Sequence, residues 1–273
     1  MFSFASMDAI SKILAPDYAI AQILWLRYVV FVGFALLMMR RRGIRAMARS
    51  ARPWLQAGRA LLLIVENGVF ILAVRYLPLA DVHALAAVSP LIVIVLSGPM
   101  LGERVGLRRW LAVSAGFAGV LIVVRPGFQS LEWPVLVPLA GALMWGLYQI
   151  LVRLCGRSDR PETTLFWSAA VGLIGASLIG PFQWKTPDVH AWELLLVLAL
   201  FGSFGHYVLI KALDFAEAGA VQPFSYTLLL WAATLGYLVF GNVPDRWTIA
   251  GAALIVASGL YSWYWERRSP GSG

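Results

Sequence analysis

The chain has 273 residues, of which 60% are hydrophobic and 13% charged, and its formal net charge is +8 at pH 7. Soluble domains carry about 25% charged residues, so this composition excludes a soluble globular protein and indicates an integral membrane protein. The positive charge would suggest nucleic acid in a soluble chain, but here it gathers in the connections between apolar runs, so no nucleic-acid partner is expected.

Charge-poor apolar runs follow one another along the whole chain. A helix rises about 1.5 Å per residue, so about 20 residues cross a hydrocarbon core about 30 Å thick. The first run is shorter than this. A truncated start of the sequence or a misassigned start codon would explain its length. We predict an all-α membrane protein with ten transmembrane helices, at residues 2–15, 19–39, 56–76, 82–102, 108–125, 132–153, 163–184, 192–212, 219–240 and 247–265.

The distribution of basic residues predicts the orientation of these helices. If the amino terminus is cytoplasmic, sixteen of the 22 Lys and Arg residues fall in cytoplasmic connections or in the tail, and four fall outside. This bias predicts that both termini are cytoplasmic. The sixteen residues are Arg40, Arg41, Arg42, Arg45, Arg49, Arg52, Arg59, Arg104, Arg108, Arg109, Arg153, Arg157, Arg160, Lys211, Arg267 and Arg268.

The second half of the chain repeats the first weakly, at an offset of 139 to 141 residues. Residues 8–12 align with 149–153, Gly102 aligns with Gly241, and the offset persists along the chain. Because each half holds five helices, an odd number, the halves are predicted to have opposite orientations. We predict two five-helix repeats at 1–126 and 131–266, with a cytoplasmic tail at 267–273. Inverted repeats are a recurring plan of secondary transporters, which bind substrate between the halves.

The segment from Leu77 to Pro126 resembles a known transporter domain. It opens with Leu-Pro-Leu-Ala at 77–80, continues with Ser89-Pro90, turns at Leu-Gly-Glu-Arg 101–104, and carries Gly116 and Gly119 on the next helix. This order of parts resembles the EamA-type domain of the drug/metabolite transporter superfamily, and the likeness covers nearly the whole chain. It implies a monomeric or homodimeric secondary transporter of the bacterial inner membrane, which moves a small organic metabolite by alternating access.

The run from Trp184 to Tyr264 looks like one branch of that superfamily, which holds S-adenosylmethionine uptake carriers and some riboflavin importers. The residues that carry this likeness are Pro187, Lys211, Ala212, Pro223, Phe224, Ser225, Tyr226, Pro244 and Asp245. The resemblance implies S-adenosylmethionine, riboflavin, amino acids or related metabolites as candidate substrates, with transport coupled to protons or to exchange.

Glu66 and Asn67 interrupt the apolar run Leu61–Val74 near its centre. A charge in mid-bilayer costs about 2.5–3.5 kcal/mol on insertion scales, so an ionisable residue there is a functional hypothesis. Glu66 either binds a cationic group of the substrate or takes up and releases a coupling proton. Alternatively, it is permanently paired with a basic neighbour or faces a wet cleft.

His206 lies 139 residues after Asn67 and 140 after Glu66, so equivalent helices of the two repeats carry polar residues at equivalent places. If these helices face each other, the three side chains line one central cavity. A lone His among Gly202, Gly205 and Tyr207 is equally compatible with packing.

Asp8 and Lys12 are four residues apart, so they lie on one helix face, where they either pair with each other or contact substrate. Arg27 lies about two turns inside the second helix, where it snorkels outward, neutralises Asp8 or Glu66, or contacts substrate. Two ionisable residues expected in solvent at the outer mouth of the fourth helix are Asp81 and His83.

Helices six and nine carry polar and aromatic side chains that could stack on a flat organic substrate and hydrogen bond to it. The alternative for each is packing within the bundle. These residues are Trp145, Tyr148, Gln149, Ser225, Tyr226 and Trp231. Prolines within helices are expected to create flexible points, and small residues such as Gly251 and Gly259 to allow close helix approach.

Enzyme signatures are absent from the sequence, including the His-Glu-x-x-His zinc motif and the Gly-Lys-Ser/Thr phosphate loop. We therefore predict that the chain is not an enzyme, and that transport is driven by gradients rather than by ATP. A single cysteine, Cys155, excludes a cysteine metal cluster, and no metal or cofactor is expected. Two alternatives remain open: a membrane-embedded enzyme acting on a lipid-linked substrate, and a passive channel.

Overall fold

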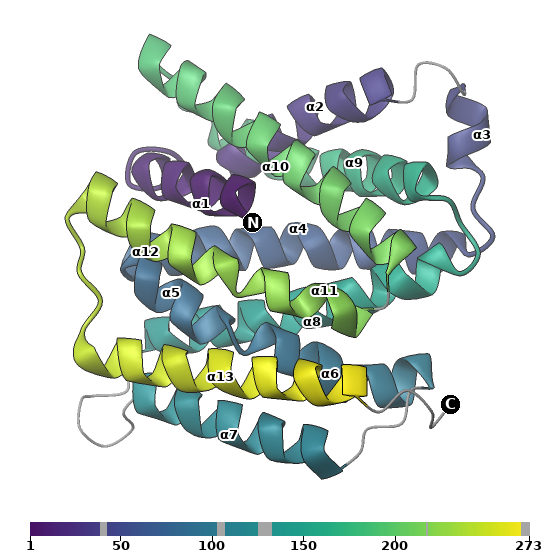
Figure 1. Cartoon of the computed structure of the whole chain (residues 1–273). Helices are drawn as coiled ribbons and strands as arrows, with labels where there is room; N and C mark the ends of the chain where they lie inside the picture. The colour runs from purple at the N-terminus through teal and green to yellow at the C-terminus, as the bar shows by residue number, and fades with distance from the viewer. Residues whose placement is uncertain (39–42, 103–106, 125–132, 217, 269–273) are drawn as a thin grey trace.

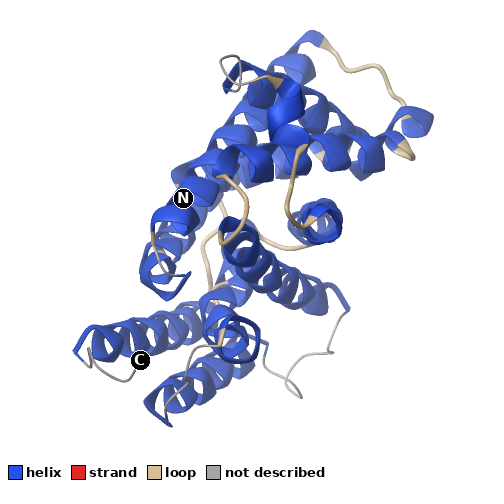
Figure 2. Cartoon of the chain, turned by 90° about the vertical axis from the view of Figure 1, so that its right-hand side faces the viewer, coloured by secondary structure: helices blue, strands red, loops and turns tan. Residues whose placement is uncertain are grey.

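The computed structural model describes residues 1–38, 43–102, 107–124, 133–216 and 218–268. These residues form helices and loops with no strand (Figure 2), so the predicted all-α class is confirmed. The basic residues 40–42, residues 103–104 of the predicted turn and tail residues 269–273 lie outside the described residues.

The helices follow the predicted runs in chain order (Figure 1). They are α1 (Phe2–Leu14), α2 (Ile20–Met38), the short α3 (Ile44–Ala48), α4 (Pro53–Tyr76), α5 (Leu79–Ala86), α6 (Ser89–Leu101), α7 (Leu107–Val124), η1 (Trp133–Val135), α8 (Leu136–Gly156), α9 (Pro161–Ser177), η2 (Gly180–Gln183), α10 (Val189–Phe215), α11 (Ala218–Ser225), α12 (Thr227–Phe240) and α13 (Arg246–Arg268).

Two of the predicted continuous helices are interrupted. The run 82–102 divides between α5 and α6 at Ala87, and the run 219–240 divides between α11 and α12 at Tyr226. Pro90 at the start of α6 has no N–H to donate to the carbonyl four residues back, which breaks the first ladder, and Pro223 lies within the last turn of α11. Ala87 and Tyr226 are 139 residues apart, so the interruptions fall at equivalent places in the two halves.

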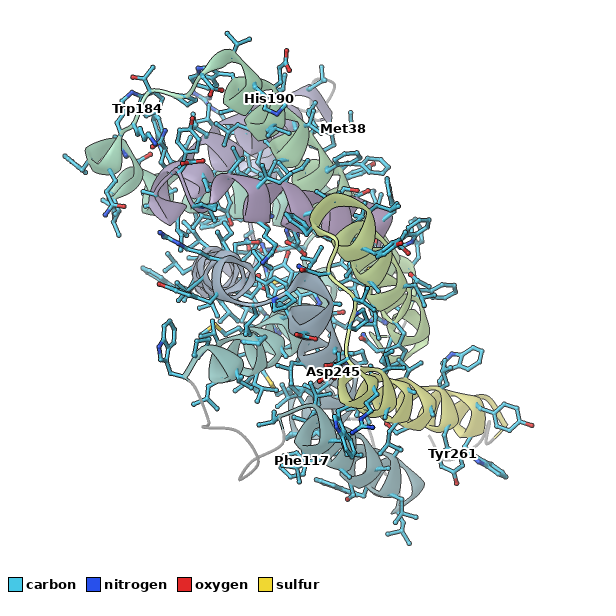
Figure 3. All side chains as sticks on the ribbon, turned by 90° about the vertical axis from the view of Figure 1, so that its left-hand side faces the viewer. Met38, Phe117, Trp184, His190, Asp245 and Tyr261 are labelled. Atoms are coloured by element: carbon cyan, nitrogen blue, oxygen red, sulfur yellow. The ribbon has the colours of Figure 1, made fainter. Side chains whose placement is uncertain are left out.

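Five helical spans of the described residues are long and apolar enough to cross a membrane. They are Ile20–Met38, Pro53–Tyr76, Leu79–Leu101, Trp133–Gly156 and Val189–Phe215, and two shorter apolar helices are Trp110–Val124 and Thr227–Phe240. Large apolar side chains also cover the outside of the bundle, and those that Figure 3 labels include Phe117 on α7 and Tyr261 on α13. The chain is a multi-pass membrane protein, while the count of ten crossings and the orientation of the termini remain predictions.

Contacts of a first-half helix with a second-half helix have counterparts in which the equivalent helices of the two halves are swapped. Helix α1 packs on α10 as α8 packs on α4, and α2 packs on α10 as α9 packs on α4. Helices α7 and α13 pack against each other at one side of the bundle (Figure 1). This pattern supports the proposal of two related halves.

Close approach of α7 and α13 depends on two glycines. A Cβ added to Gly119 would lie 2.8 Å from the carbonyl oxygen of Gly251, and a Cβ added to Gly251 would lie 2.6 Å from the carbonyl oxygen of Gly119. Both distances are shorter than van der Waals contact, and backbone cannot move aside as a flexible side chain can. The small residues therefore permit the approach that the sequence predicted.

We expect the substitution Gly119→Ala to destabilise the fold by about 1–3 kcal/mol, because it forces the two helix backbones apart. Gly58 is the matched control: it lies on α4, and nothing lies within 4 Å of an added Cβ. Gly58→Ala should be neutral or stabilising by up to about 1 kcal/mol. Thermal unfolding of the two variants in detergent tests the difference, and equal melting temperatures would contradict it.

A polar clasp joins the start of α4 to the start of α9, and consists of Gln56, Arg59, Asp159, Thr164 and Ser168. Arg59 donates to Gln56 Oε1 at 2.9 Å, to the Thr164 carbonyl at 2.9 Å and to Ser168 Oγ at 3.0 Å. Gln56 Nε2 in turn donates to Asp159 at 2.9 Å. The prediction that Arg59 belongs to a cytoplasmic connection is wrong, because its side chain is fully buried in α4 among these partners.

Asp159 lies in the loop between α8 and α9 and accepts three hydrogen bonds. Burial alone would raise the pKa of its carboxyl, but donation from Gln56, from Ser50 and from the Ala51 N–H, aided by the charge of Arg52, lowers that pKa below its usual value. A carboxyl whose folded-state pKa is depressed stabilises the fold above its unfolded pKa, near 3.8. This contribution is lost as the pH falls through the folded-state value.

We therefore expect Asp159→Asn to lower the free energy of unfolding at pH 7 by about 1–3 kcal/mol, as for hydrogen bonds to a charged group. The difference from wild type should start to shrink as the pH falls below the unfolded-state pKa near 3.8, and it should vanish only below the lower folded-state pKa, where the carboxyl is neutral in both states. Thermal unfolding across pH 3 to 7 measures it. A gap that stayed constant over this range would show that the carboxylate charge contributes nothing.

Candidate substrate cavity

A cavity with an empty volume of about 820 Å³, its open mouth included, lies among helices of both halves. Helices α1, α2, α4, α5 and α6 supply one part of its wall, and α8, α10, α11 and α12 supply the rest. Both interrupted helices meet it at their breaks, through Ala87 and Ser89 in the first half and Ser225 and Tyr226 in the second.

Glu66 and Asn67, on α4, line the cavity and are each 5% exposed. Asn67 accepts a hydrogen bond from Arg27 at 2.8 Å and donates to the Leu63 carbonyl at 2.8 Å, which fixes its amide. The Glu66 carboxylate has no hydrogen bond or ion pair with any residue that the structure describes. The interpretation that Glu66 is permanently paired with a basic neighbour therefore has no support in this structure.

Arg27, on α2, bridges the two polar positions that the repeat offset aligned. Its guanidinium donates to Asn67 Oδ1, and a second nitrogen lies 3.0 Å from His206 Nε2. A guanidinium can only donate, so Nε2 accepts, and the imidazole is neutral with its proton on Nδ1. The structure thus brings Glu66, Asn67 and His206 to one cavity, with Arg27 between the halves.

Asp8 also lines the cavity, but its partner differs from the predicted one. His83 Nε2 lies 3.3 Å from Asp8 Oδ2, although the two groups are not aligned as a hydrogen bond. Lys12 instead donates to the carbonyls of Val74 and Leu77, both at 2.6 Å, at the end of α4. The predicted Asp8–Lys12 pair is therefore wrong, because free carbonyls at a helix end attract the lysine more closely.

The aromatic and polar candidates on α8, on α11 and α12, and at the break between these last two helices divide into two groups. Trp145, Gln149 and Tyr226 line the cavity. Tyr148 lies behind this wall, fully buried, with its ring stacked on Trp145 at 5.4 Å and the Arg59 guanidinium 5.4 Å from its centroid. Of the remaining candidates, Ser225 lines the cavity, and Trp231 is 42% exposed and packs against Phe2.

Several buried polar atoms around the cavity have no hydrogen-bond partner among the residues that the structure describes. Such atoms cost about 1–3 kcal/mol each unless a ligand or water satisfies them, so their gathering around one cavity indicates a binding site. They are Ser89 Oγ, Gln149 Nε2, His206 Nδ1, Ser225 Oγ, Tyr226 OH and both ring nitrogens of His83.

Residues 1–125 and 132–263 match the EamA-like transporter family. The chain belongs to this family. Among curated relatives of this EamA-like protein, a riboflavin transporter of Rhizobium johnstonii is 31% identical over 84% of this chain and 76% of its own. An S-adenosylmethionine uptake transporter of Rickettsia prowazekii is 26% identical over 82% of this chain and 76% of its own. A pseudopaline exporter of Pseudomonas aeruginosa is 27% identical over 94% of this chain and 90% of its own.

A solved crystal structure shares the fold of this EamA-like chain. The two superpose with a TM-score of 0.68 over 99% of this chain and 98% of the other, at 19% sequence identity. The family, its named transporters and the apolar helices together establish a membrane protein of the drug/metabolite transporter superfamily. The relatives carry the names of transporters, which agrees with the prediction that the chain is not an enzyme.

Sequence reasoning missed two parts of the cavity in this EamA-like protein. The prediction that His83 is solvated is wrong: it is 2% exposed and lines the cavity beside Asp8. Ser89 stands out in the sequence only as a neighbour of Pro90, yet its hydroxyl is buried at the break between α5 and α6. The signal for both is the proline, because an interruption in a membrane helix is tolerated where it lines a cavity.

Proposed function

We propose that this protein is a secondary active transporter, which carries a small organic metabolite across the bacterial inner membrane by alternating access. The observation that carries the proposal is the cavity walled by both halves, with buried polar atoms that lack partners among the described residues. Binding between two related halves is the arrangement in which rocking of one half against the other exposes a fixed site to each side in turn.

The substrate is proposed to be a small polar organic molecule, and the relatives suggest where to begin. Their names refer to riboflavin, S-adenosylmethionine and pseudopaline, and include both uptake and export proteins. The direction of transport is therefore a separate question from the substrate. Riboflavin, S-adenosylmethionine and amino acids form the first panel.

Glu66 is proposed to be the proton-coupling group of this transporter. Its carboxylate is buried in the cavity without a partner among the described residues, while the guanidinium of Arg27 on the same cavity wall is committed to Asn67 and His206. A group held in this way can gain or lose a proton without breaking a structural ion pair. Asn67 and His206 border the same site and are proposed to contact the substrate.

Uptake into vesicles that contain the purified protein tests the proposal. We expect saturable uptake of one panel compound, accelerated when the same unlabelled compound is enclosed in the vesicle. A passive channel would give flux that does not saturate and shows no such acceleration. An enzyme would change the compound chemically, which chromatography of the vesicle contents would detect. Either result would overturn the transporter proposal.

A further inference from the structure

Two side chains of the second half line the cavity and carry hydrogen-bond donors whose roles are fixed by neighbouring side chains. The first is Gln149 on α8, which is 1% exposed. Its Oε1 accepts a hydrogen bond from Gln222 Nε2 at 3.2 Å, so its own amide nitrogen is directed elsewhere. That nitrogen has no partner in the described part of the chain, and the residue lines the cavity. Gln149 therefore offers N–H groups, not a carbonyl.

The second donor is His206 on α10, which is also 1% exposed. Because Nε2 accepts from Arg27, the ring proton sits on Nδ1, and no described residue accepts a hydrogen bond from Nδ1. If the proton moved to Nε2, the Nε2–H and the Arg27 guanidinium would be two donors facing each other, so the proton stays on Nδ1. Arg27 and Gln222 thus act as positioning residues, which fix what the two cavity side chains can donate.

Aromatic rings surround the second donor. The ring centroids of Phe4 and Trp145 lie 5.1 Å and 5.9 Å from that of His206, and 5.6 Å from each other. Both rings line the cavity. Aromatic walls favour a flat ligand that can stack or pack edge to face against them.

The charges of the cavity decide between two ligands that could accept from these donors, a carboxylate and a neutral heterocycle. The carboxyl groups of Asp8 and Glu66 both line the cavity, and they disfavour an anionic ligand there. The guanidinium of Arg27 already donates to Asn67 and His206. A neutral acceptor therefore suits the cavity better than an anionic one.

We infer that the second-half wall of the cavity is a subsite for a planar heteroaromatic ring, which accepts hydrogen bonds from Gln149 Nε2 and His206 Nδ1. This inference rests on the proposed transport function and narrows its substrate class. Carbonyl oxygens and unprotonated ring nitrogens are the acceptors that such a ring offers, as in isoalloxazines and purines. An amino acid without a heterocycle would have to accept from these donors through its carboxylate, which the carboxyl groups of Asp8 and Glu66 disfavour, so the site discriminates against it.

Paired substitutions at His206 separate ligand binding from a structural role. The amide nitrogen of asparagine reaches the position of Nδ1, so His206→Asn keeps the donor and loses the acceptor for Arg27. The amide of glutamine reaches the position of Nε2, so His206→Gln keeps the acceptor and loses the donor. We expect riboflavin or S-adenosylmethionine, whichever the wild type carries, to bind about tenfold more weakly to His206→Gln than to His206→Asn.

The substitution Gln149→Glu removes the other donor and keeps the acceptor for Gln222, and it should also weaken binding about tenfold. Gln183→Glu is the control, because Gln183 is exposed in η2, outside the cavity. Binding is measured by titration of the purified full chain, and uptake in vesicles.

Three outcomes would overturn the inference. Equal affinity in the two His206 variants would show that the Nδ1 donor does not contact the ligand, and weaker binding to His206→Asn alone would assign His206 a structural role. Saturable uptake of an amino acid without a heterocycle, but of no heteroaromatic compound, would reject the substrate class while leaving the transport function intact. Failure of the wild type to carry any compound of the panel would instead count against the proposed function itself.

Discussion

Replacement of Glu66 by glutamine is expected to reduce substrate uptake about ten- to a hundredfold and to abolish its dependence on pH. Glutamine keeps the shape of the side chain but cannot exchange a proton, so a step that needs a titrating carboxyl at this position is lost. A ten- to hundredfold reduction corresponds to a rise of about 1.4–2.7 kcal/mol in the barrier to transport. Because no described residue bonds to the carboxylate, the substitution removes no internal hydrogen bond, and the fold should be retained.

The measurement is initial uptake into vesicles between pH 5.5 and 8.5, with the internal pH held constant. Glu193→Gln is the matched control, since the side chain of Glu193 is 71% exposed near the start of α10. That variant should transport as the wild type does at every pH. If Glu66→Gln inserts normally and keeps both the rate and the pH profile of the wild type, Glu66 is not the coupling group.

The all-α class and the central polar positions can be predicted from the sequence because both are visible in its long apolar runs. The runs have the length of membrane helices, and a polar residue within such a run differs clearly from its neighbours. Glu66, Asn67 and His206 stand out from their neighbours, and the repeat offset alone aligns them. Their meeting at one cavity then follows from the packing of α4 and α10 around α8, α1 and α2.

Other features could not be predicted from the sequence because they depend on contacts between distant segments. The spacing of Asp8 and Lys12 indicates an intrahelical pair, but the free carbonyls that bind Lys12 belong to the end of α4, more than sixty residues away. Likewise, Arg59 follows a run of loop arginines, and only the approach of α9 shows that its partners are buried. A prediction based on charge alone therefore gave the wrong surroundings for both Lys12 and Arg59.

The hydrogen bonds of the Arg59 guanidinium are expected to be among the largest single contributions to the stability of this fold. Its guanidinium donates to three acceptors on two helices and lies over the ring of Tyr148, with no exposure to solvent. The substitution Arg59→Lys keeps the buried charge but cannot reproduce the planar arrangement of donors. We expect it to lower the free energy of unfolding by about 3 kcal/mol, as for a buried charge that loses its partners.

The substitution Arg59→Met provides the opposing case. It leaves Gln56 Oε1 and Ser168 Oγ with fewer partners, but it also removes the charge that had to be buried, so the loss should be only about 1–2 kcal/mol. Unfolding in detergent, followed by tryptophan fluorescence, should therefore rank wild type above Met and Met above Lys. Arg45→Met, at an exposed position of α3, should lie within about 0.5 kcal/mol of wild type. A lysine variant as stable as wild type would show that charge, and not donor geometry, stabilises this end of the bundle.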